Sequence, residues 1–272
     1  MTNTLYLDLE TFSTEPIRNG TYKYAENAEI LLFAYTWNNE PAKVLDLTAA
    51  NYSKRIQNML DFADIIVAHN SMFDRSVLNA NGFKTPVRKW QDTMVQALSL
   101  SLKSSLSDLC DIFELDADHA KDKDGKKLVQ LFCKPLGKNR KLDRATRETH
   151  PAEWEKFVEY ARLDVEAMRA IDRKLPHWNY KDSELALWHL DQTINDRGVC
   201  IDTELVEKAL VTIDAEKIRL AKQARAMTSG AVASTTQRDE TLKFILSQFG
   251  IELLDLQKST VETALLDVSR SE

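Results

Sequence analysis

The chain has 272 residues, with 36 Lys and Arg against 42 Asp and Glu, so its formal net charge is −6. An apolar content of 43% is ordinary for a folded globular protein and excludes disorder as the main state. The apolar run at 31–35 is far shorter than the roughly 20 residues of a membrane-spanning helix, and the N-terminus lacks the layout of a secretion signal. We expect a cytoplasmic protein with no membrane partner.

The three cysteines, Cys110, Cys133 and Cys200, are odd in number and widely spaced, with no CxxC pair and no nearby His. This pattern favours neither a disulfide framework nor a zinc site. We expect reduced thiols, mostly packed in the interior.

Strand patterns occupy the first 70 residues, and helical periodicity dominates from about residue 90 onward. The expected strands are 5–9, 31–37, 43–47 and 65–69, and the expected helices are 92–100, 105–115, 126–134 and 151–175. A sheet followed by helices predicts an α/β or α+β domain.

Beyond Pro176 the pattern is wholly helical. Helices are expected at 182–197, closed by Gly198, and at 203–227, whose apolar residues form one narrow stripe. We therefore predict two domains, 1–180 and 181–272.

The first expected strand carries two acidic residues on one face. Strand alternation puts Leu5, Leu7 and Leu9 on one side and places Asp8 and Glu10 together on the other. Two carboxylates at this spacing are able to share a cation, although a D-x-E pair also arises by chance.

A second acidic position follows the expected strand 65–69. If a helix starts near Asn70, then Asn70 and Asp74 lie one turn apart on the same helix face. The alternative is a helix-capping Asn with a solvated Asp.

The expected helix 151–175 places Tyr160 and Asp164 at the border of its buried stripe. With about 100° per residue, the two side chains fall on one flank, where residues that line a cleft are found. Simple packing of a Tyr at the rim of the core is the alternative for Tyr160. The buried stripe itself consists of Trp154, Phe157, Val158, Ala161, Val165, Met168 and Leu175.

Together, Asp8, Glu10, Asp74 and Asp164 form a set of four carboxylates that could converge beside the sheet. Four negative charges in one cleft repel one another unless cations occupy it. Oxygen ligands favour Mg²⁺ or Mn²⁺, and two such ions about 3.5–4 Å apart are a known arrangement for phosphodiester hydrolysis. The set therefore predicts a site for two divalent cations.

Three motifs carry a family resemblance: DLET at 8–11, HNSMFD at 69–74 and YARLD at 160–164. In order and spacing they resemble the exonuclease motifs of the DEDD superfamily, Tyr subtype. The wider segments KDKDGKKLVQLFCKP and EWEKFVEYARLDVEAMRAI are similar to the N-terminal portion of phage-type family A DNA polymerases. LDQTINDRGVCIDTELVEKAL and STTQRDETLKFILSQFGI resemble the start of the polymerase region and the tip of its thumb.

The resemblance implies an α/β, ribonuclease H-like exonuclease domain, with a mixed central sheet flanked by helices, followed by a small all-helical thumb-like region. The implied activity is removal of 5′-mononucleotides from DNA 3′ ends, of the proofreading type. The palm and fingers of that family would lie beyond residue 272, so we do not expect these residues to polymerise DNA. If the chain is phage-encoded, its location would be the host cytoplasm.

The resemblance also implies roles for individual residues. Asp8, Glu10 and Asp164 would hold one cation, and Asp8 would bridge to a second that Asp74 supports. Tyr160 and Glu10 would orient the attacking water.

Candidate nucleic-acid contacts come from two sources. Thr11 and Asn70, with the adjacent His69, match family positions that contact the terminal nucleotide. Residues 119–147 contain ten Lys or Arg against three Asp, and this net +7 segment could follow a phosphate backbone or be a solvated loop. The candidates within this segment are Lys121, Lys126 and Lys127.

The expected partners are single-stranded DNA or DNA 3′ ends, and a separate polymerase chain is a further candidate. Two other functions remain open: an RNA exonuclease like ribonuclease D, and a non-catalytic polymerase fragment that binds DNA or a partner.

Overall fold

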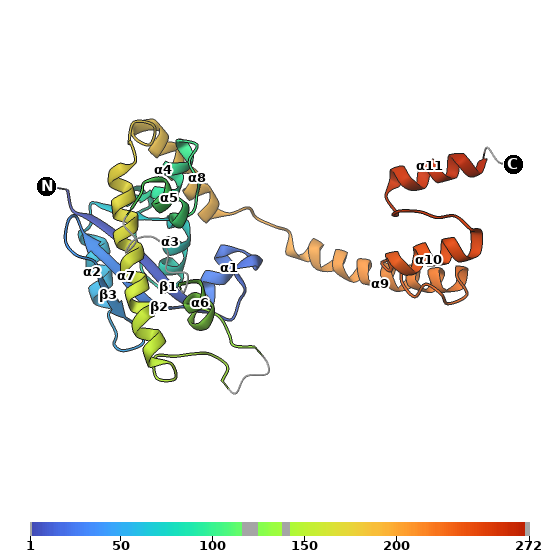
Figure 1. Ribbon diagram of the computed structural model, residues 1–272, viewed down its shortest axis with the longest axis horizontal. Helices are drawn as coiled ribbons and strands as arrows, with labels where there is room; N and C mark the ends of the chain where they lie inside the picture. Colours follow the sequence, from blue (N-terminus) through green and yellow to red (C-terminus); the bar gives the residue numbers. More distant parts are fainter. Residues whose placement is uncertain (1, 116–124, 138–141, 270–272) are drawn as a thin grey trace. The chain divides into compact units, whose positions relative to one another are not determined.

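The computed structural model of the protein describes residues 2–115, 125–137 and 142–269 (Figure 1). Within this part of the chain the residues group into two compact units, Met1–Gly198 and Val199–Glu272. Helix α8, Asp182–Arg197, falls in the first unit. The sequence-based boundary between residues 180 and 181 rests on the segment that follows the end of the expected helix 151–175, and it stays a prediction.

The first unit is built on a five-stranded mixed sheet in the order β3-β2-β1-β4-β5. Strand β1 pairs antiparallel with β2 and parallel with β4, β2 pairs antiparallel with β3, and β4 pairs parallel with β5. The strands are β1 (Thr4–Ser13), β2 (Ala28–Trp37), β3 (Lys43–Asp46), β4 (Ile65–Ala68) and β5 (Trp90–Asp92). The last of these was not predicted from the sequence.

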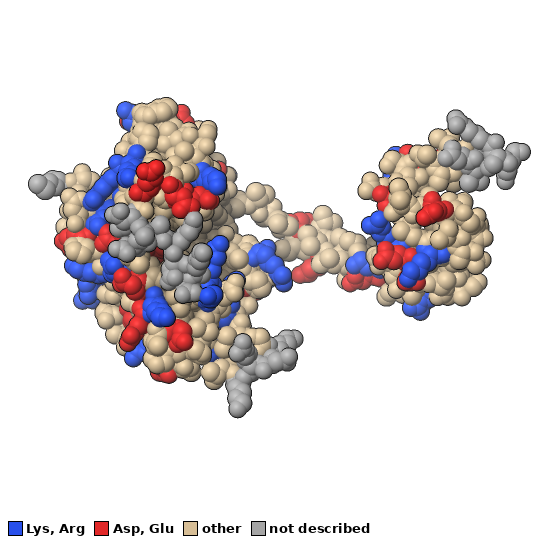
Figure 2. All heavy atoms as spheres, in the orientation of Figure 1, with Lys and Arg blue, Asp and Glu red and all other residues tan. Residues whose placement is uncertain are grey.

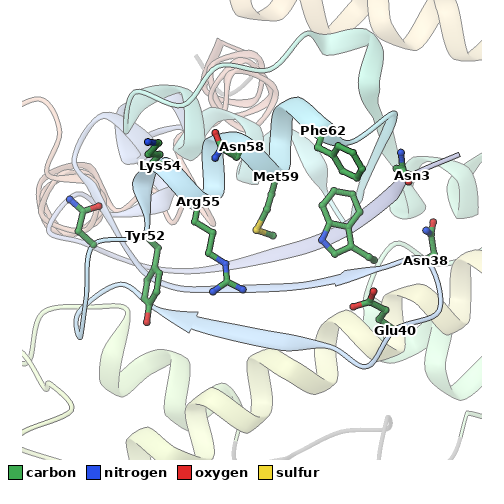
Figure 3. Close-up of a pocket in the computed structure, with 11 residues that line it drawn as sticks. Asn3, Asn38, Glu40, Tyr52, Lys54, Arg55, Asn58, Met59 and Phe62 are labelled. Carbon is green, nitrogen blue, oxygen red and sulfur yellow. The ribbon is translucent and has the colours of Figure 1, made fainter.

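Helices cover both faces of this sheet (Figure 1). The long helix α7 (Pro151–Lys174) contacts β1, β2 and β3 across one face, and α2 (Ser53–Phe62) lies on the other side of the strands, as Figure 3 shows. The shorter helices of the unit are α1 (Thr21–Glu26), α3 (Ser71–Ala80), α4 (Thr93–Ser99), α5 (Leu106–Ile112) and α6 (Gly125–Phe132), with 3₁₀ turns at Ile17–Asn19 and Val87–Lys89. The predicted α/β fold with a mixed central sheet flanked by helices is confirmed, and it is consistent with a ribonuclease H-like fold.

The core forms where the sequence patterns place apolar faces. Leu5, Leu7 and Leu9 are buried on one side of β1. The stripe predicted for α7 is buried except Val158, which is partly buried. Phe132 of α6 packs between Trp154 and Phe157 of α7, with ring centroids 4.9 and 5.1 Å away, and so fastens α6 to the long helix.

Two of the three cysteines, Cys110 and Cys133, are buried as expected, and Cys200 is exposed. No helix in the described part of the chain is long and apolar enough to cross a membrane.

The second unit is helical, with α9 (Thr203–Met227), α10 (Arg238–Phe249) and α11 (Lys258–Ser269). Asp202 caps α9 by accepting a hydrogen bond from the backbone of Leu205 at 2.9 Å. Neither α9 nor α10 has a buried residue, although apolar side chains recur along both helices.

Candidate metal centre

The site lies where β1 extends past the end of its neighbour β4. Pairing between these parallel strands stops at Tyr6 and Val67, because β4 ends at Ala68 and the chain turns into α3. Strand β1 continues to Ser13 and presents Asp8 and Glu10 beyond the paired segment. On the other edge, the register with β2 shifts between Glu10 and Thr11, a β-bulge of the kind often found beside functional sites.

Helix α3 brings Asp74 to the open edge of β1. Its carboxylate accepts a hydrogen bond from the backbone N–H of Leu9 at 3.1 Å, a donor that β4 does not reach. The side chain is 2% exposed, so the alternative of a solvated Asp74 is wrong.

The start of α3 is held by another carboxylate. Asp92, at the end of β5, accepts hydrogen bonds from the backbone N–H groups of Asn70 and Ser71 at 3.0 and 2.7 Å. It also caps α4 through the N–H groups of Met94 and Val95. Asn70 itself adopts a left-handed conformation, with φ of 65°, and makes no side-chain cap. Asp92 thus fixes the direction in which α3 leaves the sheet, and with it the position of Asp74.

Helix α7 supplies the remaining acidic group from across the sheet face. The Tyr6 hydroxyl donates to the carboxylate of Asp172 at 2.7 Å, which fixes α7 along β1 two turns beyond Asp164. Asp164 then lies over Asp8, and Tyr160 lies one turn earlier, close enough to Asp164 for that carboxylate, in addition to burial, to raise the pKa of the Tyr160 hydroxyl.

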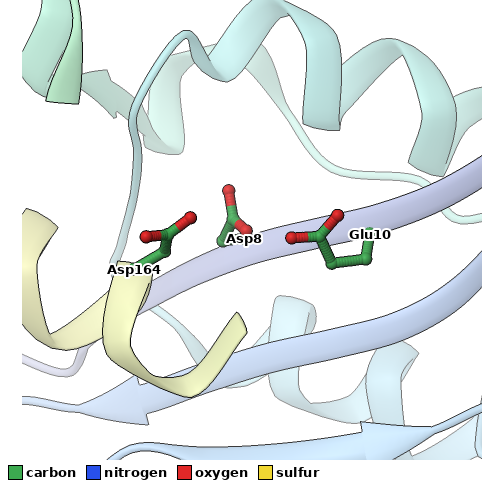
Figure 4. A group of neighbouring side chains, drawn as sticks. All are labelled: Asp8, Glu10 and Asp164. Carbon is green, nitrogen blue, oxygen red and sulfur yellow. The ribbon is translucent and has the colours of Figure 1, made fainter. Parts of the chain in front are cut away.

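These elements bring three predicted ligands into one cluster. One carboxylate oxygen from each of Asp8, Glu10 and Asp164 lies within 4.8 Å of the others (Figure 4). Asp74 stands beside this group rather than in it: its oxygen is bonded to Leu9, while its charge acts on both Asp8 and Glu10.

The electrostatics show how poorly the chain itself compensates these charges. Burial raises the pKa of Asp8 to about 6, and burial together with the Asp8 charge raises the pKa of Asp164 to about 8. Burial and the neighbouring carboxylates hold the pKa values of Glu10 and Asp74 well above their usual range. Among the described residues, no Lys or Arg forms an ion pair with any of the four.

Such a cluster of charged carboxylates is destabilising for the protein without a cation, and it suits a hard divalent cation. Taking carboxylates out of water and close to one another disfavours their charged forms, unless a positive charge shares the site. All donors in the cluster are carboxylate oxygens, the ligands that Mg²⁺ and Mn²⁺ prefer. The residues present therefore suit the cation chemistry expected from the sequence.

Cys133 is a contact that the sequence did not reveal. Its thiol donates a hydrogen bond to Oε2 of Glu10 with a sulfur–oxygen distance of 3.6 Å. Burial and the Glu10 charge raise the pKa of the thiol, so it remains an S–H donor. Nothing in the spacing of the cysteines pointed to this role, because the pairing spans residues far apart in the chain.

The predicted nucleic-acid contacts lie in different environments. Thr11 is buried beside Glu10, and its hydroxyl is 2.8 Å from the Tyr24 hydroxyl. The ring nitrogens of His69 lie 2.9 Å from the Thr93 hydroxyl and 2.8 Å from the Ser104 carbonyl, so both already have protein partners.

Asn70, Lys126 and Lys127 are exposed, whereas Lys121 lies outside the described residues. Two other basic residues of segment 119–147 are held in ion pairs, Arg144 with Glu29 and Arg147 with Asp46. On the face seen in Figure 2, the described Lys and Arg side chains of the first unit are interspersed with Asp and Glu. The nucleic-acid contacts stay predictions.

A cavity of about 740 Å³ adjoins the carboxylates. It is lined by Glu10 and Thr11 of β1, Phe73 of α3, and Val129 and Cys133 at α6. A second cavity of about 840 Å³ lies on the α2 side of the sheet and is lined by none of the predicted site residues (Figure 3). Of these two cavities, only the first adjoins the acidic cluster.

Comparison with known proteins finds a similar phage protein. The chain is 35% identical over 269 residues to the DNA polymerase of Bacillus phage SP02. The match covers 95% of this chain and 41% of the phage polymerase, so the chain spans about two-fifths of that relative's length. No protein-family model matches the chain.

Proposed function

We propose that this protein is a metal-dependent 3′–5′ exonuclease of the proofreading type, which hydrolyses DNA 3′ ends to 5′-mononucleotides. The observation that carries the proposal is the convergence of Asp8, Glu10 and Asp164 within 4.8 Å, with Asp74 next to them and Tyr160 near Asp164. The similarity to a phage DNA polymerase supports DNA as the substrate. The sequence motifs support the class of exonuclease.

In this proposal Asp8, Glu10 and Asp164 would hold one Mg²⁺ or Mn²⁺, and Asp8 with Asp74 would hold a second. Two cations held there would supply a hydroxide from water and stabilise the departing oxygen. The role of the protein is to fix the ligands: Leu9 N–H orients Asp74, and Cys133 S–H orients Glu10.

Tyr160 and Glu10 orient the attacking water. Burial and the nearby carboxylates raise the pKa of Tyr160, so its hydroxyl stays protonated and can donate a hydrogen bond at any working pH. Water adds to the phosphorus, the bond from phosphorus to the 3′ oxygen breaks, and that oxygen takes a proton. The products are a 5′-mononucleotide and a DNA strand shorter by one residue.

The cavity beside Glu10 is of the size that small ligands occupy, about 300–1,000 Å³. We propose that the terminal nucleotide enters it, with Thr11 and Asn70 as contacts. His69 would act by supporting the loop before α3, since both its ring nitrogens are bonded within the protein. Exposed Lys126 and Lys127 on α6 are the described basic candidates for the DNA backbone.

We also propose that residues 181–272 form a thumb-like region of a family A polymerase. A further proposal is that the protein acts in the host cytoplasm together with a polymerase activity on the same or a separate chain. Helix α8 packs on the first unit, where Arg75 bonds to Gln192 and Asp196.

The experiment is incubation of the protein with single-stranded DNA labelled at its 3′ or 5′ end, with Mg²⁺ or with EDTA. We expect immediate release of the 3′ label as a mononucleotide, a descending ladder from the 5′-labelled strand, and no product in EDTA. A matched RNA strand run in parallel would identify a ribonuclease D-like activity by faster cleavage. DNA binding without any Mg²⁺-dependent product would identify a non-catalytic binding module.

A further inference from the structure

Helix α6 lies against the candidate site at both of its ends. Its first residue, Gly125, touches the ring of Tyr160, and Cys133, directly after its last residue, bonds to Glu10. Between them, Leu128 and Phe132 are buried, and Phe132 packs on Trp154 and Phe157 of α7. The same packing that holds α6 on the long helix therefore fixes both contacts.

The contact at Gly125 leaves no room for a side chain. A Cβ added at this residue would lie 2.4 Å from Cε2 and 2.8 Å from Cδ2 of Tyr160, closer than a Cβ atom approaches other carbons in proteins. Gly125 does not have a positive φ, so the requirement is one of space and not of backbone conformation. The absence of a Cβ allows the Tyr160 ring to take its position over Gly125, with the hydroxyl near Asp164.

The contact at Cys133 acts on the other water-orienting group. The backbone N–H of Cys133 continues the helical pattern by donating to Val129 at 2.9 Å, and this directs the thiol toward β1. By occupying Oε2 of Glu10, the thiol selects one orientation of that carboxylate relative to Asp8 and Asp164. Hydrogen bonds of this kind to a metal ligand determine how well the ligand is oriented.

We propose that α6 is the positioning element of the nuclease site, with Gly125 setting the place of the Tyr160 hydroxyl and Cys133 setting the orientation of the Glu10 carboxylate. The inference rests on the proposed exonuclease function and deepens it: each residue acts through a water-orienting group, Gly125 through Tyr160 and Cys133 through Glu10.

Gly125 is tested by a double-mutant cycle with Tyr160→Phe. The phenylalanine keeps the ring, and so the steric conflict, but lacks the hydroxyl. We expect Gly125→Ala to reduce kcat in the parent by about 10-fold or more, the same loss as expected for Tyr160→Phe, and to change kcat little in the Tyr160→Phe background. An equal loss in both backgrounds would mean that Gly125 has only a structural role.

The matched control is Gly137→Ala. A Cβ at Gly137 meets nothing within 4 Å, so this variant is expected to keep the parent kcat.

Cys133 is tested by comparing Cys133→Ala, which removes the donor, with Cys133→Ser, which retains one. We expect Cys133→Ala to weaken Mn²⁺ binding and lower kcat by about 10-fold or more, and Cys133→Ser to restore most of both. Cys110→Ala removes a buried thiol elsewhere in the first unit and should leave Mn²⁺ affinity unchanged. Equal affinities in the Ala and Ser variants at position 133 would overturn this role.

A measurement without substrate separates this inference from the proposed function. In protein labelled with 3-fluorotyrosine, the ¹⁹F resonance of Tyr160 is assigned from its loss in Tyr160→Phe. We expect Gly125→Ala to shift that resonance and to leave the resonances of the other tyrosines in place. A parent protein without nuclease activity would refute the proposed function, whereas an unmoved Tyr160 resonance would refute the positioning role of Gly125.

Discussion

Two carboxylate regions in the first unit have opposite environments: one is the buried Asp92, and the other is buried Glu10 with the partly buried Asp8 and Asp164. Asp92 accepts hydrogen bonds from four backbone N–H groups, those of residues 70, 71, 94 and 95, and from the Ser71 hydroxyl at 2.9 Å. No donor among the described residues reaches the Asp8 carboxylate in this way, and Glu10 has the Cys133 thiol. The first region is satisfied by the chain, whereas the second has oxygens left for a ligand.

This difference distinguishes a carboxylate that stabilises the fold from one that is available to bind a ligand. Burying a carboxylate costs little if backbone donors replace its water, and Asp92 uses those donors to fix two helix starts. The cluster of Asp8, Glu10 and Asp164 lacks such compensation and has raised pKa values as a result. A group of acids that the fold keeps together without backbone donors is a candidate for cation binding.

The largest expected effect is on catalysis. We expect Asp8→Ala or Asp164→Ala to lower the exonuclease rate by about 10²–10⁴-fold or more while the fold is retained, because the variant loses a ligand and also relieves repulsion. Cleavage rates on 5′-labelled DNA check the loss of activity, and circular dichroism checks that the fold is retained. Near-parental cleavage in either variant would remove that residue from the site.

The converse is expected at Asp92. We expect Asp92→Ala to lower the free energy of unfolding by about 2 kcal/mol or more, since several buried N–H groups lose their acceptor and α4 loses its cap. Urea unfolding of this variant, compared with Asp8→Asn in EDTA, measures the contrast directly. If Asp8→Asn were the more destabilised of the two, the distinction between the regions would fail.

Much of this site follows from local patterns. The alternation of β1 predicted that Asp8 and Glu10 share a face, and counting around α7 placed Tyr160 and Asp164 at the border of the buried stripe. Both predictions depend on periodicity, which is a property of the residues within one element.

The remaining features depend on contacts between distant segments. Where α7 lies along β1 is fixed by Tyr6 and Asp172, 166 residues apart, and no pattern in either segment contains that information. The three-residue strand β5 was missed because it is too short to show alternation. Gly125 and Cys133 gained their roles only when α6 packed on α7.

A smaller effect is expected at Tyr160. We expect Tyr160→Phe to lower kcat by about 10-fold or more with little change in DNA affinity, since an oriented water contributes mainly in the transition state. Single-turnover rates and equilibrium binding in Ca²⁺ distinguish the two quantities. A weakened affinity with unchanged kcat would assign Tyr160 to substrate binding instead.

A further effect is the dependence of the free energy of unfolding on pH. The folded-state pKa values of Asp8 and Asp164, about 6 and about 8, lie above the ordinary carboxyl value of 3.8. At pH values between 3.8 and these raised values, the folded protein therefore binds more protons than the unfolded chain. In EDTA, the contribution of these two carboxyl groups to the free energy of unfolding is therefore fully present below about pH 4. It is lost as the pH rises toward 8. The difference in unfolding free energy between the parent and Asp164→Asn isolates one group, and a difference that is constant from pH 5 to 9 would contradict the raised pKa of Asp164.

The central claim is that the acidic cluster holds two divalent cations, and anomalous diffraction from crystals soaked in Mn²⁺ tests it most directly. The account predicts two peaks about 3.5–4 Å apart. One is expected among the oxygens of Asp8, Glu10 and Asp164, and the other beside Asp8 and Asp74. Well-diffracting, Mn²⁺-saturated crystals with no peak among these oxygens would contradict it.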